Sequence, residues 1–189
     1  MTTLPNGYRE VKRIDLMRNR RQAVLVNLLA LAITAVVVAL GFALCPPMFE
    51  QKIEIGIHTI IGMIALCGGV VLYMILHELI HGLFMKAFSG KKPRYGFTGL
   101  YAFAGSDALF TRRQYLIIAF APVVILGVLI AVLNVAFYES AFWALYLIQI
   151  LNLSGAAGDF YVGFLIARSK NDVLVRDMGT DMSFYSYRS

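Results

Sequence analysis

The sequence predicts an all-α polytopic membrane protein with four transmembrane helices and a membrane-associated β-hairpin-like segment between the second and third. Hydrophobic residues make up 59% of the 189-residue chain, and its mean hydropathy of +0.72 exceeds that of soluble globular proteins. Four apolar segments are long enough to span a bilayer. These segments are residues 23–45, 56–88, 115–138 and 141–167. They form one predicted domain, residues 23–167, between a basic arm, residues 1–22, and a tail, residues 168–189.

The charges that flank the spans predict how they cross the membrane. Of the 17 Lys and Arg residues, all but Lys52 precede the first span, lie between Lys86 at the end of the second span and the start of the third, or follow the fourth. Positively charged flanks stay on the cytosolic side. Both termini and the central connection are therefore expected in the cytosol, in a multi-pass protein of the cell membrane. The same distribution explains the pI near 9.4 without a nucleic-acid partner.

The two flanking segments each have two interpretations. In the arm, Val11, Ile14 and Met17 recur three apart among basic residues, which predicts either an interfacial helix on anionic lipid or a solvated arm. The tail either folds over the mouth of the site or ends in solvent. The second span is longer than a bilayer requires, so it is expected to tilt or to extend past the bilayer on its cytosolic side.

The connection of residues 89–114 is too apolar and aromatic for an ordinary cytosolic loop. Tyr95, Phe97, Tyr101 and Phe103 fall at alternate positions, and residues 105–107 supply turn chemistry. The pattern predicts short strands or a hairpin that approaches the membrane interior. Irregular backbone at that depth is tolerated only where it is buried in protein or lines a cavity.

Residues 77–81 read HELIH inside the second apolar span. His77 and His81, at i and i+4, fall on one helical face and can bind one metal ion together. Glu78 is placed to act as general base on a metal-bound water, and zinc, one ion per chain, is the metal that such a site favours. The alternative is that both histidines are satisfied polar groups of a helix bundle. Ionisable groups at membrane depth are costly and usually functional, which favours the metal.

Catalytic zinc sites use three protein ligands, and Asp159 is the candidate for the third. Apart from Glu78, it is the only carboxylate well inside a predicted span. His77 and Asp159 each lie nine residues before a basic residue, hence both about 13 Å from a cytosolic-side charge. The alternative is a small-residue packing seam, residues 155–158, with a hydrogen-bonded Asp.

Asn152 lies seven residues before Asp159 and is expected on the same helical face. Its amide is expected either to bind substrate, by polarising a carbonyl or holding the backbone, or to bond a neighbouring helix. His58 lies near the outer end of the second span and is not expected to be a ligand.

This order of motifs resembles the intramembrane zinc metalloproteases of the site-2 protease type, and more closely the zincin peptidases of the DUF3267 family. HELIH lies in one span, residues 114–122 (QYLIIAFAP) open the next, and Asn152, Gly155 and Asp159 follow in the last. The site-2 pattern has a proline after the Asn and a glycine after the Asp. Here Gly155 stands in the proline region and Phe160 follows Asp159.

The resemblance implies that His77, His81 and Asp159 bind zinc, that Glu78 is the catalytic base, and that residues 94–110 form a membrane-associated hairpin that presents substrate. The implied activity is hydrolysis of peptide bonds of membrane proteins or peptides. The hairpin would hold an extended peptide by strand addition, so proline at Tyr101 or Phe103 is expected to impair turnover.

Other functions remain open for the same motif. A membrane zinc hydrolase acting on a lipid amide would use the same site. A non-catalytic zinc-binding protein would keep the ligands, although the retained Glu78 argues against it. A metal transporter would need polar residues along a whole path, and the spans offer little of that kind beyond Asn27, Asn134, Gln149 and Ser154.

Overall fold

Five helices and five strands make up the part of the chain that the computed structural model describes, residues 3–15, 17–45, 56–99, 101–169 and 172–187. The helices are α1 (Arg20–Leu44), α2 (Ile57–Ser89), α3 (Arg112–Ala136), α4 (Tyr138–Gly155) and α5 (Ala157–Ala167). The strands are β1 (Tyr8–Ile14), β2 (Arg94–Phe97), β3 (Ala102–Thr111), β4 (Leu174–Asp177) and β5 (Met182–Tyr187).

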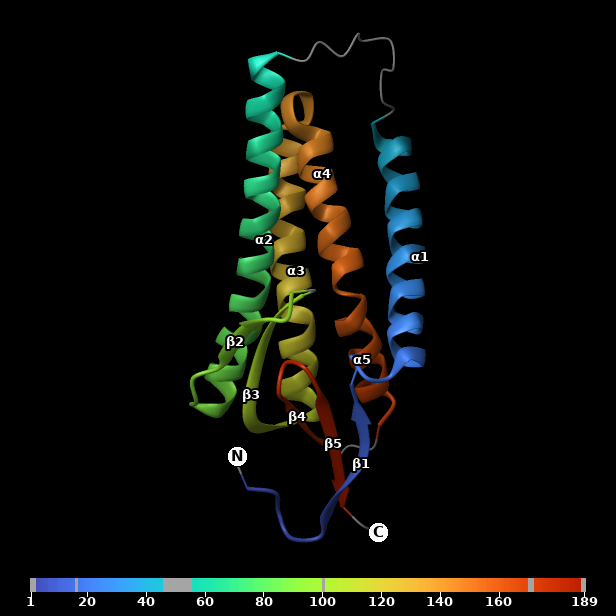
Figure 1. The fold of residues 1–189 in the computed structure, drawn as a ribbon, viewed down its shortest axis with the longest axis vertical. Coiled ribbons are helices and arrows are strands. Elements are labelled where there is room, and N and C mark those ends of the chain that lie inside the picture. Colours follow the sequence, from blue (N-terminus) through green and yellow to red (C-terminus); the bar gives the residue numbers. More distant parts are fainter. Residues whose placement is uncertain (1–2, 16, 46–55, 100, 170–171, 188–189) are drawn as a thin grey trace.

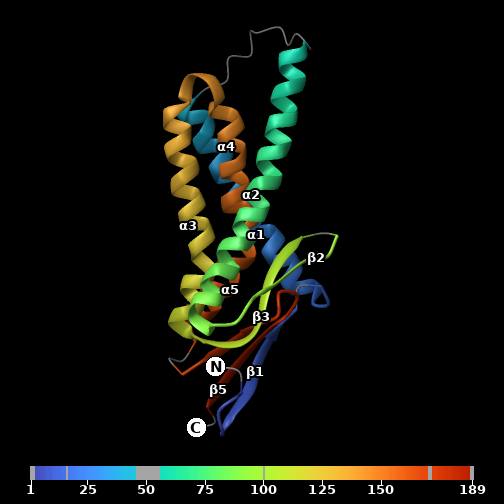
Figure 2. The same ribbon diagram turned by 90° about the vertical axis from the view of Figure 1, so that its left-hand side faces the viewer.

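The four predicted spans are confirmed as helices. α1, α2, α3 and the α4–α5 pair are each long and apolar enough to cross a membrane, and their ends lie within three residues of the predicted ones. Large aliphatic side chains such as Leu31, Ile64 and Val135 are exposed on their outer faces, as a surface that contacts lipid requires. α1 packs on α4 and α5, while α2 packs on α3, and Figure 2 shows α2 inclined to α3.

The fourth span is two helices rather than one. The chain leaves α4 at Gly155, Ala156 adopts φ −80° and ψ 12°, and α5 begins at Ala157. Figure 1 shows the interruption near the end of the bundle that the sheet covers. Asp159 consequently lies in the first turn of α5.

The strands form one antiparallel sheet in the order β1-β5-β4-β3-β2, so the fold is not all-α. The sheet lies at one end of the helical bundle, where both chain ends also lie (Figure 1). The sequence predicted only the β2–β3 hairpin. The N-terminal segment forms β1 rather than an interfacial helix, and it pairs with β5, Tyr8 opposite Tyr187.

The sheet and the helices share one hydrophobic core. Phe110, Val175 and Phe184 of the sheet pack against Ile118 of α3 and Ile166 of α5, all at most 3% exposed. This core fixes the sheet beneath the ends of α2, α3 and α5. The tail therefore returns to the bundle as β4 and β5 instead of ending in solvent.

β3 and α3 are continuous, which fixes the hairpin relative to the bundle. β3 ends at Thr111, whose side chain caps α3 in a reciprocal pair with Gln114. The hairpin lies against α2 (Figure 2). There the Tyr95 side chain covers Gly82, which leaves no room for a Cβ. Gly82 directly follows His81, so the hairpin lies beside the HELIH motif.

Candidate metal centre

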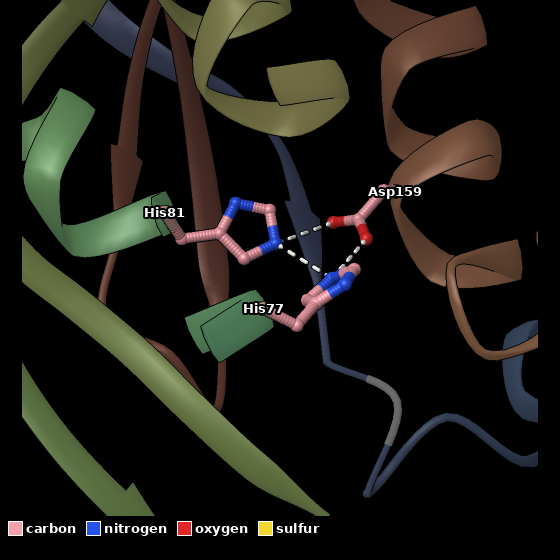
Figure 3. Close-up of side chains that lie close together, drawn as sticks. All are labelled: His77, His81 and Asp159. Carbon is pink, nitrogen blue, oxygen red and sulfur yellow. Dashed lines mark hydrogen bonds and ion pairs between the residues drawn. The ribbon is translucent and has the colours of Figure 1, made fainter. Parts of the chain in front are cut away.

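The HELIH helix presents both histidines to α5. His77 and His81 are 7% and 8% exposed, and their rings lie one helical turn apart. Asp159 approaches them from the first turn of α5 (Figure 3). The two Nε2 atoms are 3.2 Å apart, and the Asp159 carboxylate oxygens lie 3.4 Å from His77 Nε2 and 3.5 Å from His81 Nε2.

The spacing of these donor atoms fits a zinc ion. In a tetrahedral site with ligands at 2.0–2.1 Å, neighbouring ligand atoms lie about 3.3–3.4 Å apart. The Nε2–Nε2 distance is close to that value, as is the distance from each Nε2 to one Asp159 oxygen, Oδ2 for His77 and Oδ1 for His81. His77, His81 and Asp159 also form a group whose ligand atoms lie within 4.8 Å of one another.

A backbone carbonyl fixes the tautomer of His81. Its Nδ1 lies 2.9 Å from the Ile118 carbonyl oxygen, which can only accept a hydrogen bond, so Nδ1 carries the proton. Nε2 of the neutral ring is then left with its lone pair. The Ile118 carbonyl is free for this bond because the residue four positions on is Pro122, which has no N–H to donate to it.

A tyrosine does the same for His77. The Tyr73 hydroxyl donates to the Leu151 carbonyl oxygen at 3.3 Å, so it accepts from His77 Nδ1, also at 3.3 Å. Metal-binding histidines characteristically donate their second N–H in this way. The bond also connects α2, which carries the histidine, to α4.

These two bonds make the centre unfavourable without a cation. Both Nε2 atoms present lone pairs toward each other and toward the Asp159 carboxylate, so three electron-rich atoms face one point. A metal ion at that point, or a proton on one ring, removes the repulsion. The chemistry of the donor set therefore fits zinc, and three protein ligands are the number that catalytic zinc sites use.

Glu78 lies beside the ligands and is not one of them. It is half-buried and directly follows His77 on α2. It lines the same cavity as His77, His81 and Asp159. Its position beside the centre, in the wall of the same cavity, is the one that a general base requires.

The cavity has a volume of about 700 Å³, within the range of ligand sites. Its wall includes parts of all five helices and of β3, the last residue of β1, and the turn between β4 and β5. At the sheet end, the Tyr115 hydroxyl donates to Asp177, which also accepts from the Gly179 N–H. Burial raises the pKa of Asp177, against the opposing effect of these two donors.

The structure does not bring Asn152 to the centre. Its side chain is fully buried, its amide donates to the Val123 carbonyl oxygen of α3 at 3.1 Å, and it is not among the described residues that line the cavity. Because the helix is interrupted at Ala156, Asn152 and Asp159 do not share one helical face although they are seven residues apart. In this position Asn152 bonds one helix to another, the second of its two predicted roles.

Three residues of the site were missed by sequence reasoning. Tyr73 and Pro122 orient the histidines, and Asp177 lies in the cavity wall. Tyr73 precedes His77 by four residues on the same helical face, so spacing alone contains that signal. His58, as expected, lies at the start of α2, far along the helix from the ligands.

The bundle and its centre define a helical protein with four membrane-type helices and a candidate metal site on an HExxH motif. The chain belongs to the DUF3267 family of putative zincin peptidases, whose family model matches residues 70–174. The match begins within α2 and ends at the first residue of β4, so it contains all three candidate ligands and leaves out β1, α1 and β5. The chain has no significant match among the curated proteins or the solved structures.

Pro122→Ala is predicted to weaken zinc binding. Alanine supplies an N–H that competes for the Ile118 carbonyl, so His81 Nδ1 loses part of its acceptor. Loss of such an outer contact typically lowers metal affinity about 10–100-fold. The zinc Kd is measured by competition with a chromophoric chelator. Val124→Ala, an exposed neighbour on α3, serves as control, and equal zinc affinity of Pro122→Ala and wild type would contradict this role.

Proposed function

We propose that this protein is a zinc-dependent, membrane-embedded peptidase that hydrolyses peptide bonds of membrane proteins or peptides. The observation that carries the proposal is the meeting of His77, His81 and Asp159 beside Glu78 in one cavity of a bundle with four membrane-type helices. Membership of a zincin peptidase family agrees with this chemistry.

The chain's own groups divide the work of hydrolysis. Bound zinc supplies a water of lowered pKa and a Lewis acid for the scissile carbonyl oxygen. Glu78 accepts the proton of the attacking water on its carboxylate and delivers it to the nitrogen of the leaving amine. Tyr73 and the Ile118 carbonyl hold the two imidazoles in the tautomer that keeps Nε2 available.

The edge of β3 is suited to holding an extended peptide. The Thr98 N–H donates to the Tyr101 carbonyl at 3.0 Å, and bonded and non-bonded pairs alternate along an antiparallel ladder. By this alternation, Ala102 and Ala104 form non-hydrogen-bonded pairs with their partners on β2. The N–H and C=O groups of these two alanines therefore point away from β2.

No described strand covers that part of β3 on its second edge. β4 pairs with β3 only from Ser106 onward, while residues 101–104 line the cavity. A substrate strand placed there would lie beside Glu78, with main-chain bonds giving affinity. A transmembrane helix hides its main chain in its own hydrogen bonds, so the substrate must unwind locally before it binds.

We further propose that the sheet, both termini and the cavity mouth lie on the cytosolic side of the cell membrane. The flanking Lys and Arg residues support this orientation. The close approach of the two chain ends in the sheet agrees with it, since β1 pairs with β5.

The proposal predicts cleavage of a membrane peptide by purified protein. A suitable probe is a fluorescein-labelled Leu/Ala transmembrane peptide of about 25 residues with a central Gly-Ser pair and flanking lysines. Wild type in proteoliposomes is expected to cleave it, and Glu78→Gln to be about 10²–10⁴-fold slower with its zinc retained. Products are identified by mass spectrometry. Cleavage of a lipid amide, with every membrane peptide left intact, would instead establish the alternative hydrolase.

Ala102→Pro is predicted to raise KM for the peptide without removing zinc. Ala102 opens β3, where proline is tolerated, and the N–H that it loses faces the cavity. Phe97→Pro is the matched control because Phe97 is the other member of the same pair, and its N–H faces the outer edge of β2.

The register also corrects the positions expected from the sequence. Phe103 belongs to a bonded pair and the Tyr101 carbonyl accepts from Thr98, so proline at Tyr101 or Phe103 would disturb the hairpin itself. Impaired turnover in Phe97→Pro, with Ala102→Pro unaffected, would place the substrate on β2 and refute the β3 edge.

A further inference from the structure

α1 brings one polar side chain to the cavity. Asn27 lies within the apolar run of α1 and lines the cavity together with Tyr73, His77 and Glu78 of α2. α1 lies outside the segment that the family model matches. Among the described residues, the Asn27 amide has no hydrogen-bond partner, whereas the Thr34 hydroxyl of the same helix donates to the Ala30 carbonyl at 2.9 Å.

The depth of Asn27 makes this amide unusual. It lies six residues after Arg21, the nearest basic residue, or about 9 Å along the helix, and His77 lies about 13 Å from Lys86 by the same measure. Asn27 and the metal centre therefore reach similar depths. The Asn27 side chain is exposed and lines the cavity, so its amide is free to bond a molecule that enters there.

An extended peptide bound to β3 would have main-chain N–H and C=O groups on its other edge that also need hydrogen-bond partners. β3 bonds only one edge of such a strand, and the main-chain groups of the other edge face across the cavity. At membrane depth they have little water to bond. An asparagine amide offers both a donor and an acceptor, so it can pair with either a main-chain N–H or a carbonyl.

We propose that Asn27 is a substrate-binding residue that hydrogen-bonds the main chain of an extended peptide on the edge left open by β3. This inference rests on the proposed peptidase function. It assigns α1 a part in the site, as the wall that faces β3 across the bound peptide. Asn27 is outside the metal-binding group, so its replacement leaves the ligands unchanged.

Peptide binding to the Glu78→Gln protein tests this role without turnover. The probe is the labelled Leu/Ala peptide described above, and its Kd is measured by fluorescence anisotropy in zinc-loaded proteoliposomes. Adding Asn27→Leu is expected to raise Kd about tenfold, since a buried group left without its partner costs about 1–3 kcal/mol. Asn27→Gln keeps the amide and is expected to restore most of the affinity. Thr34→Val is the control on the same helix, with unchanged Kd expected.

An ester scan of the probe separates a direct bond from a structural effect. Replacing one peptide bond by an ester removes an N–H and weakens a carbonyl acceptor. At the bond that Asn27 contacts, the ester is expected to weaken binding to Glu78→Gln protein and to have little effect once Asn27→Leu is added. Identical ester profiles with and without Asn27→Leu would overturn the inference.

The outcomes also separate this inference from the function on which it rests. Glu78→Gln protein that binds no peptide while Asn27 is intact would overturn the peptidase proposal and the inference with it. Binding that Asn27→Leu leaves unchanged would overturn the role of Asn27 alone.

Discussion

Two imidazole lone pairs held 3.2 Å apart in front of a carboxylate are the constraint on which this structure depends. Such an arrangement is repulsive unless a cation is shared, so the surrounding fold must hold it in place. Four elements do so. α2 carries the histidines, the α3 carbonyl freed by Pro122 orients one ring, Tyr73 and α4 orient the other, and α5 supplies Asp159.

The proposed placement in a membrane would explain why the fold combines a bundle with a sheet. Helices satisfy their own main chain and can be lipid-exposed, whereas strand edges and broken helices need protein or water around them. Here the interrupted helix and the unpaired edge of β3 both lie at the cavity, which residues on either side of Ala156 help to line. β1, β4 and β5 complete the sheet so that it can shield one end of the site.

Much of this arrangement is local in sequence and was predictable from it. Apolar length gave the four spans, the i, i+4 spacing gave the histidine pair, and the scarcity of intramembrane carboxylates pointed to Asp159. β1 was not predictable, because its partner β5 lies at the opposite end of the chain and only Ile14 of the strand is buried. The predicted substrate-binding role of Asn152 assumed one continuous helix from Asn152 to Asp159. The helix is interrupted at Ala156, so the two residues do not share a face.

The most direct test of the account is the zinc content of the detergent-purified protein, measured by elemental analysis for the wild type and three variants. The account predicts about one zinc per chain in wild type and Glu78→Gln, and its loss in His77→Ala and Asp159→Ala. That result would establish three ligands and a separate base. A folded wild type without zinc, or an Asp159→Ala variant that binds zinc as tightly as wild type, would contradict it.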